Sequence, residues 1–193
     1  MLLAVTLLFS ATPGLPLLQA VLEPSEEFCV ECCSLYCAAA PTVGVSRHLP
    51  PQAGNEYGPG ALDDGKGETA WVVRHGVGDW FEFVFEVAGF HADFPVDNTR
   101  TGVDSLYLWN GYNKSPQRWR EHSRVRKLRM TVDGRELALV TLLDDARPQR
   151  VVLPPTLLRR GMKLRFTIVE TYPGTHFDET ALSEVRLDGY GHH

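Results

Sequence analysis

The sequence predicts an all-β fold, an antiparallel sandwich of about eight strands, from three kinds of pattern. Segments in which apolar and polar residues alternate recur from residue 71 to residue 187. Turn signals rich in glycine, proline and aspartate separate these segments. Helical periodicity is nearly absent, apart from a weak turn at residues 155–160. These patterns are typical of a sandwich in which each strand buries one face.

The strongest strand signal is the segment 80–87, because three of its phenylalanines share one face of an extended chain and belong in a core. The segment 105–109 is apolar on both faces, so we expect its Trp109 to lie in the core as well. Further strands are expected at residues 127–132, 136–142, 149–153, 163–169 and 182–187. A Val-Asp-Gly-Arg sequence at 132–135 predicts a tight hairpin between two of them.

Composition fits one globular domain and argues against nucleic acid as the partner. The chain has 193 residues, of which 44% are hydrophobic and 22% charged. Its net charge of −5 and its isoelectric point near 5.8 provide no overall positive field to attract a polyanion.

The N-terminal residues predict export. Residues 1–20 are apolar, uncharged in their side chains and broken by proline and glycine, which is typical of a signal peptide cleaved after Ala11 or Ala20. Residues 21–44 would then form a cysteine-rich segment and a linker, and residues 45–191 the folded domain. No later apolar run is long enough for a membrane helix, so we expect a secreted or periplasmic protein without a membrane span.

The cysteines all lie close together in the sequence, at Cys29, Cys32, Cys33 and Cys37. An even number of cysteines in an exported chain predicts two local disulfides, with free or intermolecular thiols as the alternative. Zinc binding is disfavoured, because Cys32 and Cys33 are adjacent and suit a tetrahedral site poorly.

The segment 61–71 is an acidic, glycine-rich loop that leads into a strand. Asp63, Asp64, Glu68 and Thr69 bring oxygen atoms together, and the glycines between them let backbone carbonyls turn inward. The loop therefore suits one Ca²⁺ ion, although an ordinary solvated turn has the same composition and the spacing is not that of an EF-hand.

Two segments carry a family resemblance. The first is Ala61-x-Asp-Asp-Gly65 followed by Thr69-x-Trp71, and the second is the alternating stretch 180–189 that ends on a glycine. Together they resemble the discoidin (coagulation factor type C) family, whose fold is a galactose-binding-like jelly roll.

The resemblance implies one structural Ca²⁺ shared by the first loop and the last strand. It makes Asp64 a side-chain ligand and Glu184 the distant carboxylate. The remaining ligands would come from Thr69 and from carbonyls near Ala61, Gly67 and Ser183.

The middle of the chain narrows the resemblance. Asn110-Gly-Tyr-Asn-Lys-Ser-Pro116 with Trp119, and Tyr172-Pro-Gly-Thr175, are similar to the glycan-binding-type module that accompanies bacterial NAD glycohydrolases and is described there as a translocation domain. The similarity covers residues 45–189 with two departures: His122 stands where an Asn is expected, and residues 89–104 form an insertion.

The loop at residues 110–124 is the candidate ligand surface. It combines aromatic rings with polar and cationic side chains, and its candidate ligand-binding residues are Tyr112, Asn113, Lys114, Trp119 and Arg124. The alternative is that Asn110 and Trp119 pin a long loop onto the sheet.

The chain has no Gly-x-Ser-x-Gly, His-Glu-x-x-His or P-loop motif, so we expect no enzymatic activity. Two functions remain: an exported module that binds carbohydrate or another cell-surface ligand, and an adaptor for an enzymatic or toxin-like partner that binds no sugar itself.

Overall fold

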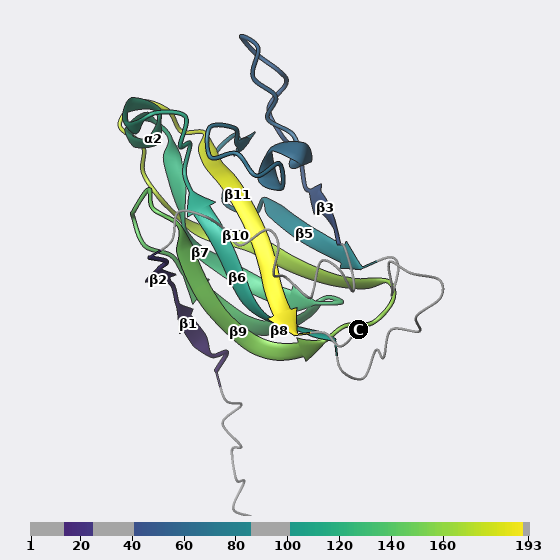
Figure 1. The fold of residues 1–193 in the computed structure, drawn as a ribbon. Coiled ribbons are helices and arrows are strands. Elements are labelled where there is room, and N and C mark those ends of the chain that lie inside the picture. The colour runs from purple at the N-terminus through teal and green to yellow at the C-terminus, as the bar shows by residue number, and fades with distance from the viewer. Residues whose placement is uncertain (1–13, 25–40, 86–100, 191–193) are drawn as a thin grey trace, which may run out of the picture.

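The computed structural model describes residues 14–24, 41–85 and 101–190, which form eleven strands and two short helices (Figure 1). The strands are β1 (Leu17–Gln19), β2 (Val21–Leu22), β3 (Thr42–Val45), β4 (Trp71–Val73), β5 (Trp80–Phe85), β6 (Gly102–Asn110), β7 (Ser123–Val132), β8 (Arg135–Thr141), β9 (Gln149–Leu157), β10 (Met162–Tyr172) and β11 (Thr180–Tyr190). The helices are the 3-10 helix η1 (Pro59–Leu62) and the α-helix α2 (Pro116–Glu121).

The predicted all-β class is confirmed, and each predicted strand segment overlaps one of the strands β5 to β11. The strand β4 is the one expected after the acidic loop, whereas the extra strands β1 to β3 are too short to show a clear alternation of residues. The weak helical turn expected at 155–160 is wrong, because β9 continues to Leu157. Pro154 and Pro155 are compatible with this strand because, among the described residues, β2 pairs with β9 at residues 149 and 150 and not at the two prolines.

The strands form two groups that face each other across the core. One group runs β2-β9-β6-β11-β4, and the other runs β3-β5-β10-β7-β8-β1. A short parallel pairing of Thr180 with Ser123 and of Ala181 with Arg124 joins the two groups where β11 and β7 begin. Most pairings are antiparallel as predicted, but this one and the β1–β8 pairing are parallel, so the sandwich is mixed.

The core contains the predicted row of phenylalanines. Phe81 stacks on Phe166 with ring centroids 5.2 Å apart, and Phe83 and Phe85 are buried on the same face of β5. The predicted hairpin is present between β7 and β8, where Asp133 (φ 48°) and Gly134 (φ 83°) both take the positive φ values of a type I′ turn. The core therefore fixes the sandwich from which the loops described below extend.

Residues 14–24 connect the edges of both strand groups. Beside β1, the N–H of Leu139 donates to the carbonyl of Pro16 (2.9 Å), and the N–H of Ala20 donates to that of Thr141 (2.9 Å). Ala20, one of the two expected cleavage positions, is buried in the core. Cleavage after Ala20 would remove β1 from the fold, whereas cleavage after Ala11 would leave it in place.

Three sequence predictions fall outside the described residues. They are the signal peptide up to residue 13, the four cysteines, and the insertion up to residue 100. In the described part of the chain, no helix has the length and apolar character needed to cross a bilayer.

Candidate functional site

Three loops meet at the end of the sandwich where β7 and β11 begin: residues 46–70, 111–122 and 173–179. The N–H of Phe177 donates to the carbonyl of Glu121 (2.8 Å), which ties the third loop to the second. The hydroxyl of Tyr112 donates to Asn55 Oδ1 (3.2 Å), which ties the second loop to the first. We refer to this region as the loop end.

Asn110 anchors the second loop to the sheet. Its buried side chain donates to the carbonyls of Val125 (2.7 Å) and Leu143 (3.2 Å), and accepts from the N–H of Val125 (3.0 Å). Its own carbonyl accepts from Trp119 Nε1 (2.9 Å). The alternative expectation, in which Asn110 and Trp119 pin the loop, is therefore what the structure has.

Arg124 is also a structural residue, which corrects its expected ligand contact. It is 6% exposed, donates to the carbonyls of His122 and Pro173 and forms a bidentate ion pair with Asp144. Its guanidinium lies 4.6 Å from the centre of the Trp119 ring, so it covers one face of that ring. The Arg124 donors are therefore bonded within the protein, and one face of the Trp119 ring is covered.

The remaining candidates of this loop differ in their accessibility. Tyr112 is 4% exposed, which corrects its expected role as an open stacking face. Burial is the main cause that raises the pKa of Tyr112 to about 12, so its hydroxyl stays protonated and can donate. Asn113 is held by its N–H, which donates to Ser183 Oγ (3.0 Å). Lys114 is exposed, and its ammonium group donates to Asn55 Oδ1.

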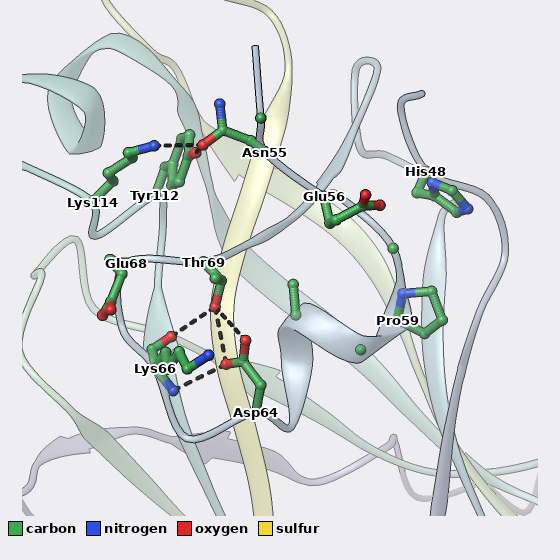
Figure 2. Close-up of a pocket in the computed structure, with 14 residues that line it drawn as sticks. His48, Asn55, Glu56, Pro59, Asp64, Lys66, Glu68, Thr69, Tyr112 and Lys114 are labelled. Atoms are coloured by element: carbon green, nitrogen blue, oxygen red, sulfur yellow. Dashed lines mark hydrogen bonds between the residues drawn. The ribbon is translucent and has the colours of Figure 1, made fainter. Parts of the chain in front are cut away.

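A cavity of about 720 Å³ lies between the first loop and Lys114 (Figure 2). Figure 2 shows Asn55 at one side of it, where Lys114 and Tyr112 converge on the side-chain oxygen, and Asp64 and Thr69 at another. The other side chains that line it are polar or small: His48, Glu56, Pro59, Ala61, Lys66 and Glu68. Its size suits a small organic ligand with several hydrogen-bonding groups.

A second cavity, of about 290 Å³, lies on the other side of the same contacts and shares Asn55, Tyr112 and Lys114 with the first. Its lining is more aromatic, with Tyr57, His122 and Phe177 among its residues, and it also includes Arg118 and Glu179. The sequence analysis did not identify Asn55, Tyr57 or Phe177. The glycine and asparagine at 54–55 mark a turn, but no local signal indicates that this turn meets Tyr112, 57 residues away.

Glu184 is the most unusual carboxylate in the described residues. It is 1% exposed, and its buried Oε2 atom has no hydrogen-bond partner among the described residues. Burial is the first cause that raises the pKa of Glu184 to about 8, and the nearby Asp63 and Asp64 carboxylates add to it. Arg186 and the N–H of Gly65 act in the opposite direction. A bound cation would stabilise this buried carboxylate oxygen, which lacks a partner and has two further acidic residues nearby.

The expected calcium ligands fit such an ion only with help from the backbone. No three His, Cys, Asp or Glu side chains in the described ranges are grouped closely enough to hold a metal by themselves. Carbonyls would have to complete the site, as the expected contributions of Ala61, Gly67 and Ser183 require. Thr69 already orders the loop, because its hydroxyl lies 2.9 Å from Asp64 Oδ1 and 3.0 Å from the Lys66 carbonyl (Figure 2).

Trp109 corrects a further expectation, since it lies beside this loop and not in the core. It is half-buried on the outer face of β6, where it pairs in register with Glu184. A Cβ atom on Gly67 would lie 3.8 Å from the Trp109 ring. Trp109 is therefore part of the surface against which the acidic loop packs.

Solved structures with the same fold include carbohydrate-binding modules. CpGH89CBM32-5 from Clostridium perfringens, in complex with GalNAc-β-1,3-galactose, matches with a TM-score of 0.54 and 13% identity over 77% of this chain and 94% of that one. The CBM32-1 and CBM32-2 domains of ZmpB from the same organism, in complex with GalNAc, match with a TM-score of 0.57 and 10% identity. That match covers 94% of this chain and 41% of the two-module chain. At these identities the likeness establishes the fold alone.

The family itself is identified by a sequence model. A search of functionally curated proteins finds no match. The family model described as the NAD glycohydrolase translocation F5/8 type C domain matches residues 35–188, which is most of the chain and includes the three loops of the loop end. The chain therefore belongs to the NAD glycohydrolase translocation family of F5/8 type C domains.

Proposed function

We propose that this protein is an exported, non-catalytic module that binds carbohydrate at the loop end and uses one Ca²⁺ ion to order the acidic loop. The observation that carries the proposal is the convergence of Tyr112, Lys114 and Asn55 between two cavities on a rigid sandwich. Loops on a rigid scaffold are where binding residues usually lie.

The chemistry of the cavities supports a polyhydroxylated ligand. Sugar hydroxyls both donate and accept hydrogen bonds, and the larger cavity offers both kinds of partner, with donors from Lys66 and Lys114 and acceptors from Glu56 and Glu68. The smaller cavity adds aromatic surface for the C–H face of a sugar ring. The CBM32 modules that share the fold support the same ligand class, because their structures contain GalNAc or GalNAc-β-1,3-galactose.

The proposed Ca²⁺ would have a structural role. Asp64 and Glu184 would hold it through their carboxylates, with Thr69 and backbone carbonyls, and its charge would satisfy the buried Glu184 oxygen. The same loop supplies Ala61, Asp64 and Thr69 to the wall of the larger cavity, so ordering the loop would also fix the shape of that cavity.

The second candidate function is that of an adaptor for an enzymatic or toxin-like partner. The description of the family as a translocation domain favours it. In this case the loop end would contact a protein, and no free sugar would bind.

A glycan array separates the two functions. Calcium-saturated protein should be retained on at least one glycan, with GalNAc and GalNAc-β-1,3-galactose as the first probes, and chelator should weaken the retention. If the folded, calcium-saturated protein is retained on no glycan, the carbohydrate proposal fails and the adaptor function is favoured.

Point variants locate the site. Lys114→Ala removes an exposed cation, and Tyr112→Phe removes a hydroxyl while keeping the buried ring, so both should weaken glycan retention by about tenfold with little change in melting temperature. Arg135→Ala, an exposed change at the β7–β8 turn at the other end of β7, is the matched control and should bind as the wild type does. Equal binding by all of these variants would place the site elsewhere.

A further inference from the structure

His122 is a buried ring at the end of α2 with one nitrogen committed to the backbone. The residue is 8% exposed, and its Nδ1 lies 2.9 Å from the carbonyl of Arg118. A carbonyl oxygen can only accept a hydrogen bond, so this contact assigns the hydrogen of the neutral ring to Nδ1. Nε2 is then a lone-pair acceptor.

The acceptor of His122 is available to a ligand. Nε2 has no hydrogen-bond partner in the described part of the chain, and it is not one of the fully buried atoms that lack one. The ring lines the smaller cavity between two other rings. Its centroid lies 5.2 Å from that of Tyr112 and 4.7 Å from that of Phe177. Because Nδ1 is already bonded, Nε2 is the one polar atom that this side chain can offer to a molecule in the cavity.

The rest of the smaller cavity limits what that molecule can be. Its volume of about 290 Å³ holds roughly ten waters at ~30 Å³ each, which is room for one sugar ring. Tyr57 and Phe177 are half-buried and supply apolar surface, while Lys114 and Arg118 supply N–H donors. Glu179 and Asn55 add carboxylate and amide oxygen acceptors, so the cavity offers a ligand both kinds of hydrogen-bonding partner.

We propose that the smaller cavity binds one neutral hexopyranose and that His122 accepts a hydrogen bond from one of its hydroxyls through Nε2. This assignment rests on the proposed carbohydrate-binding function and deepens it, because it names the ring-sized subsite and a residue that selects the ligand. It also gives a role to the histidine that replaces the asparagine expected at this position of the family pattern.

The assignment makes binding depend on pH. Burial is the main cause that lowers the pKa of His122 from 6.5, while the hydrogen bond to the Arg118 carbonyl raises it. The Arg118 charge lowers the pKa further, and Glu179 and Glu121 raise it; Lys114 is the other cation of the cavity. A proton on Nε2 converts the acceptor into a donor and adds a cation beside Arg118. Sugar affinity should therefore fall as the pH falls through the pKa of His122, below 6.5.

The test uses the full chain, saturated with Ca²⁺, and the best glycan from the array. Calorimetry at pH 7.5, 6.0 and 5.0 should show a dissociation constant that rises at least fivefold across the series. His122→Gln keeps an amide acceptor that does not titrate, so it should bind with a dissociation constant that changes less than twofold. Any loss that comes from other acidic groups, including the calcium ligands, would appear in both proteins and is removed by the comparison.

A second readout comes from NMR titration of the His122 ring. The free protein should titrate below pH 6.5, and the bound sugar should lower that pKa further, since it binds the neutral ring. An identical pH dependence in wild type and His122→Gln, or a His122 pKa that the sugar leaves unchanged, overturns the assignment while the carbohydrate function stands. Absence of glycan binding at every pH overturns the function and the assignment together.

Discussion

Glu184→Gln is the substitution whose effect the structure predicts most specifically. The glutamine keeps the shape of the side chain and removes its charge. In the metal-free protein, the Glu184 pKa is raised from 4.5 to about 8. Folding therefore favours the protonated form, and its stabilising effect is fully present below pH 4.5 and is lost as the pH rises through 8.

The size of the effect follows from that pKa. One pKa unit corresponds to about 1.4 kcal/mol, so the free energy of unfolding of metal-free protein should fall by about 4 kcal/mol between pH 4.5 and pH 8. Glu184→Gln should remove most of this slope. At pH 8 without metal, the variant should therefore be more stable than the wild type.

Calcium should narrow the difference in stability between the two proteins at pH 8. An ion that binds only the folded state stabilises it by about 2.7 kcal/mol at 100 times its dissociation constant. The wild type should gain this stability at pH 8, whereas Glu184→Gln should gain little because a carboxylate ligand is missing. Asp64→Ala should likewise lose most of the gain.

The assay is urea denaturation of metal-free and calcium-saturated protein between pH 5 and pH 8.5. Glu136→Gln, which removes an exposed carboxylate on β8, is the control and should keep the wild-type slope and the response to calcium. Equal slopes for wild type and Glu184→Gln, together with a stability that ignores calcium and chelator, would refute both the buried charge and the metal site.

Three further predictions concern the scaffold and the cysteines. Gly111→Ala should lower the free energy of unfolding by about 2 kcal/mol or more, because at φ 87° the added Cβ would lie 2.7 Å from Trp119. The control is Gly134→Ala, at φ 83° in open space, which should lower the free energy of unfolding by about 1 kcal/mol in the same urea titration. Arg124→Ala should lower the free energy of unfolding by about 3 kcal/mol in urea denaturation, because two carbonyls and Asp144 lose their donor. A decrease below about 0.5 kcal/mol would contradict the assigned structural role. In exported protein, the four cysteines at 29–37 should resist thiol labelling until reduced, and four labelled thiols in unreduced material would contradict the predicted disulfides.

Much of the fold can be predicted from the sequence because its strands carry local signals. The phenylalanines of β5 and the Asp-Gly turn between β7 and β8 each encode their structure within a few residues. The short strands β1 and β2 escape prediction because two or three residues cannot show an alternation. Their apolar residues instead resemble the end of a signal peptide, although β1 pairs with β8.

The candidate site is less predictable because contacts between distant loops decide it. Loop composition identifies Lys114 as exposed and polar. It does not reveal that the guanidinium of Arg124, ten residues later, donates its hydrogen bonds to Asp144 and to two backbone carbonyls. Composition also overstates Tyr112 as a stacking surface, because its burial depends on Tyr57 and Ala181 from other segments. Glu184 is the opposite case, where a family resemblance selects the residue and the unpartnered buried oxygen gives a physical reason for the selection.

NMR chemical-shift mapping tests the central claim, carbohydrate binding at the loop end, most directly. Isotope-labelled, calcium-saturated protein would be titrated with the best glycan from the array, with the Lys114→Ala variant in parallel. The account predicts saturable shifts at residues 52–57, 112–118 and 177–179, with a weaker affinity in the variant. Shifts confined to another surface, such as the β7–β8 turn, or no saturable shift in folded protein, would contradict it.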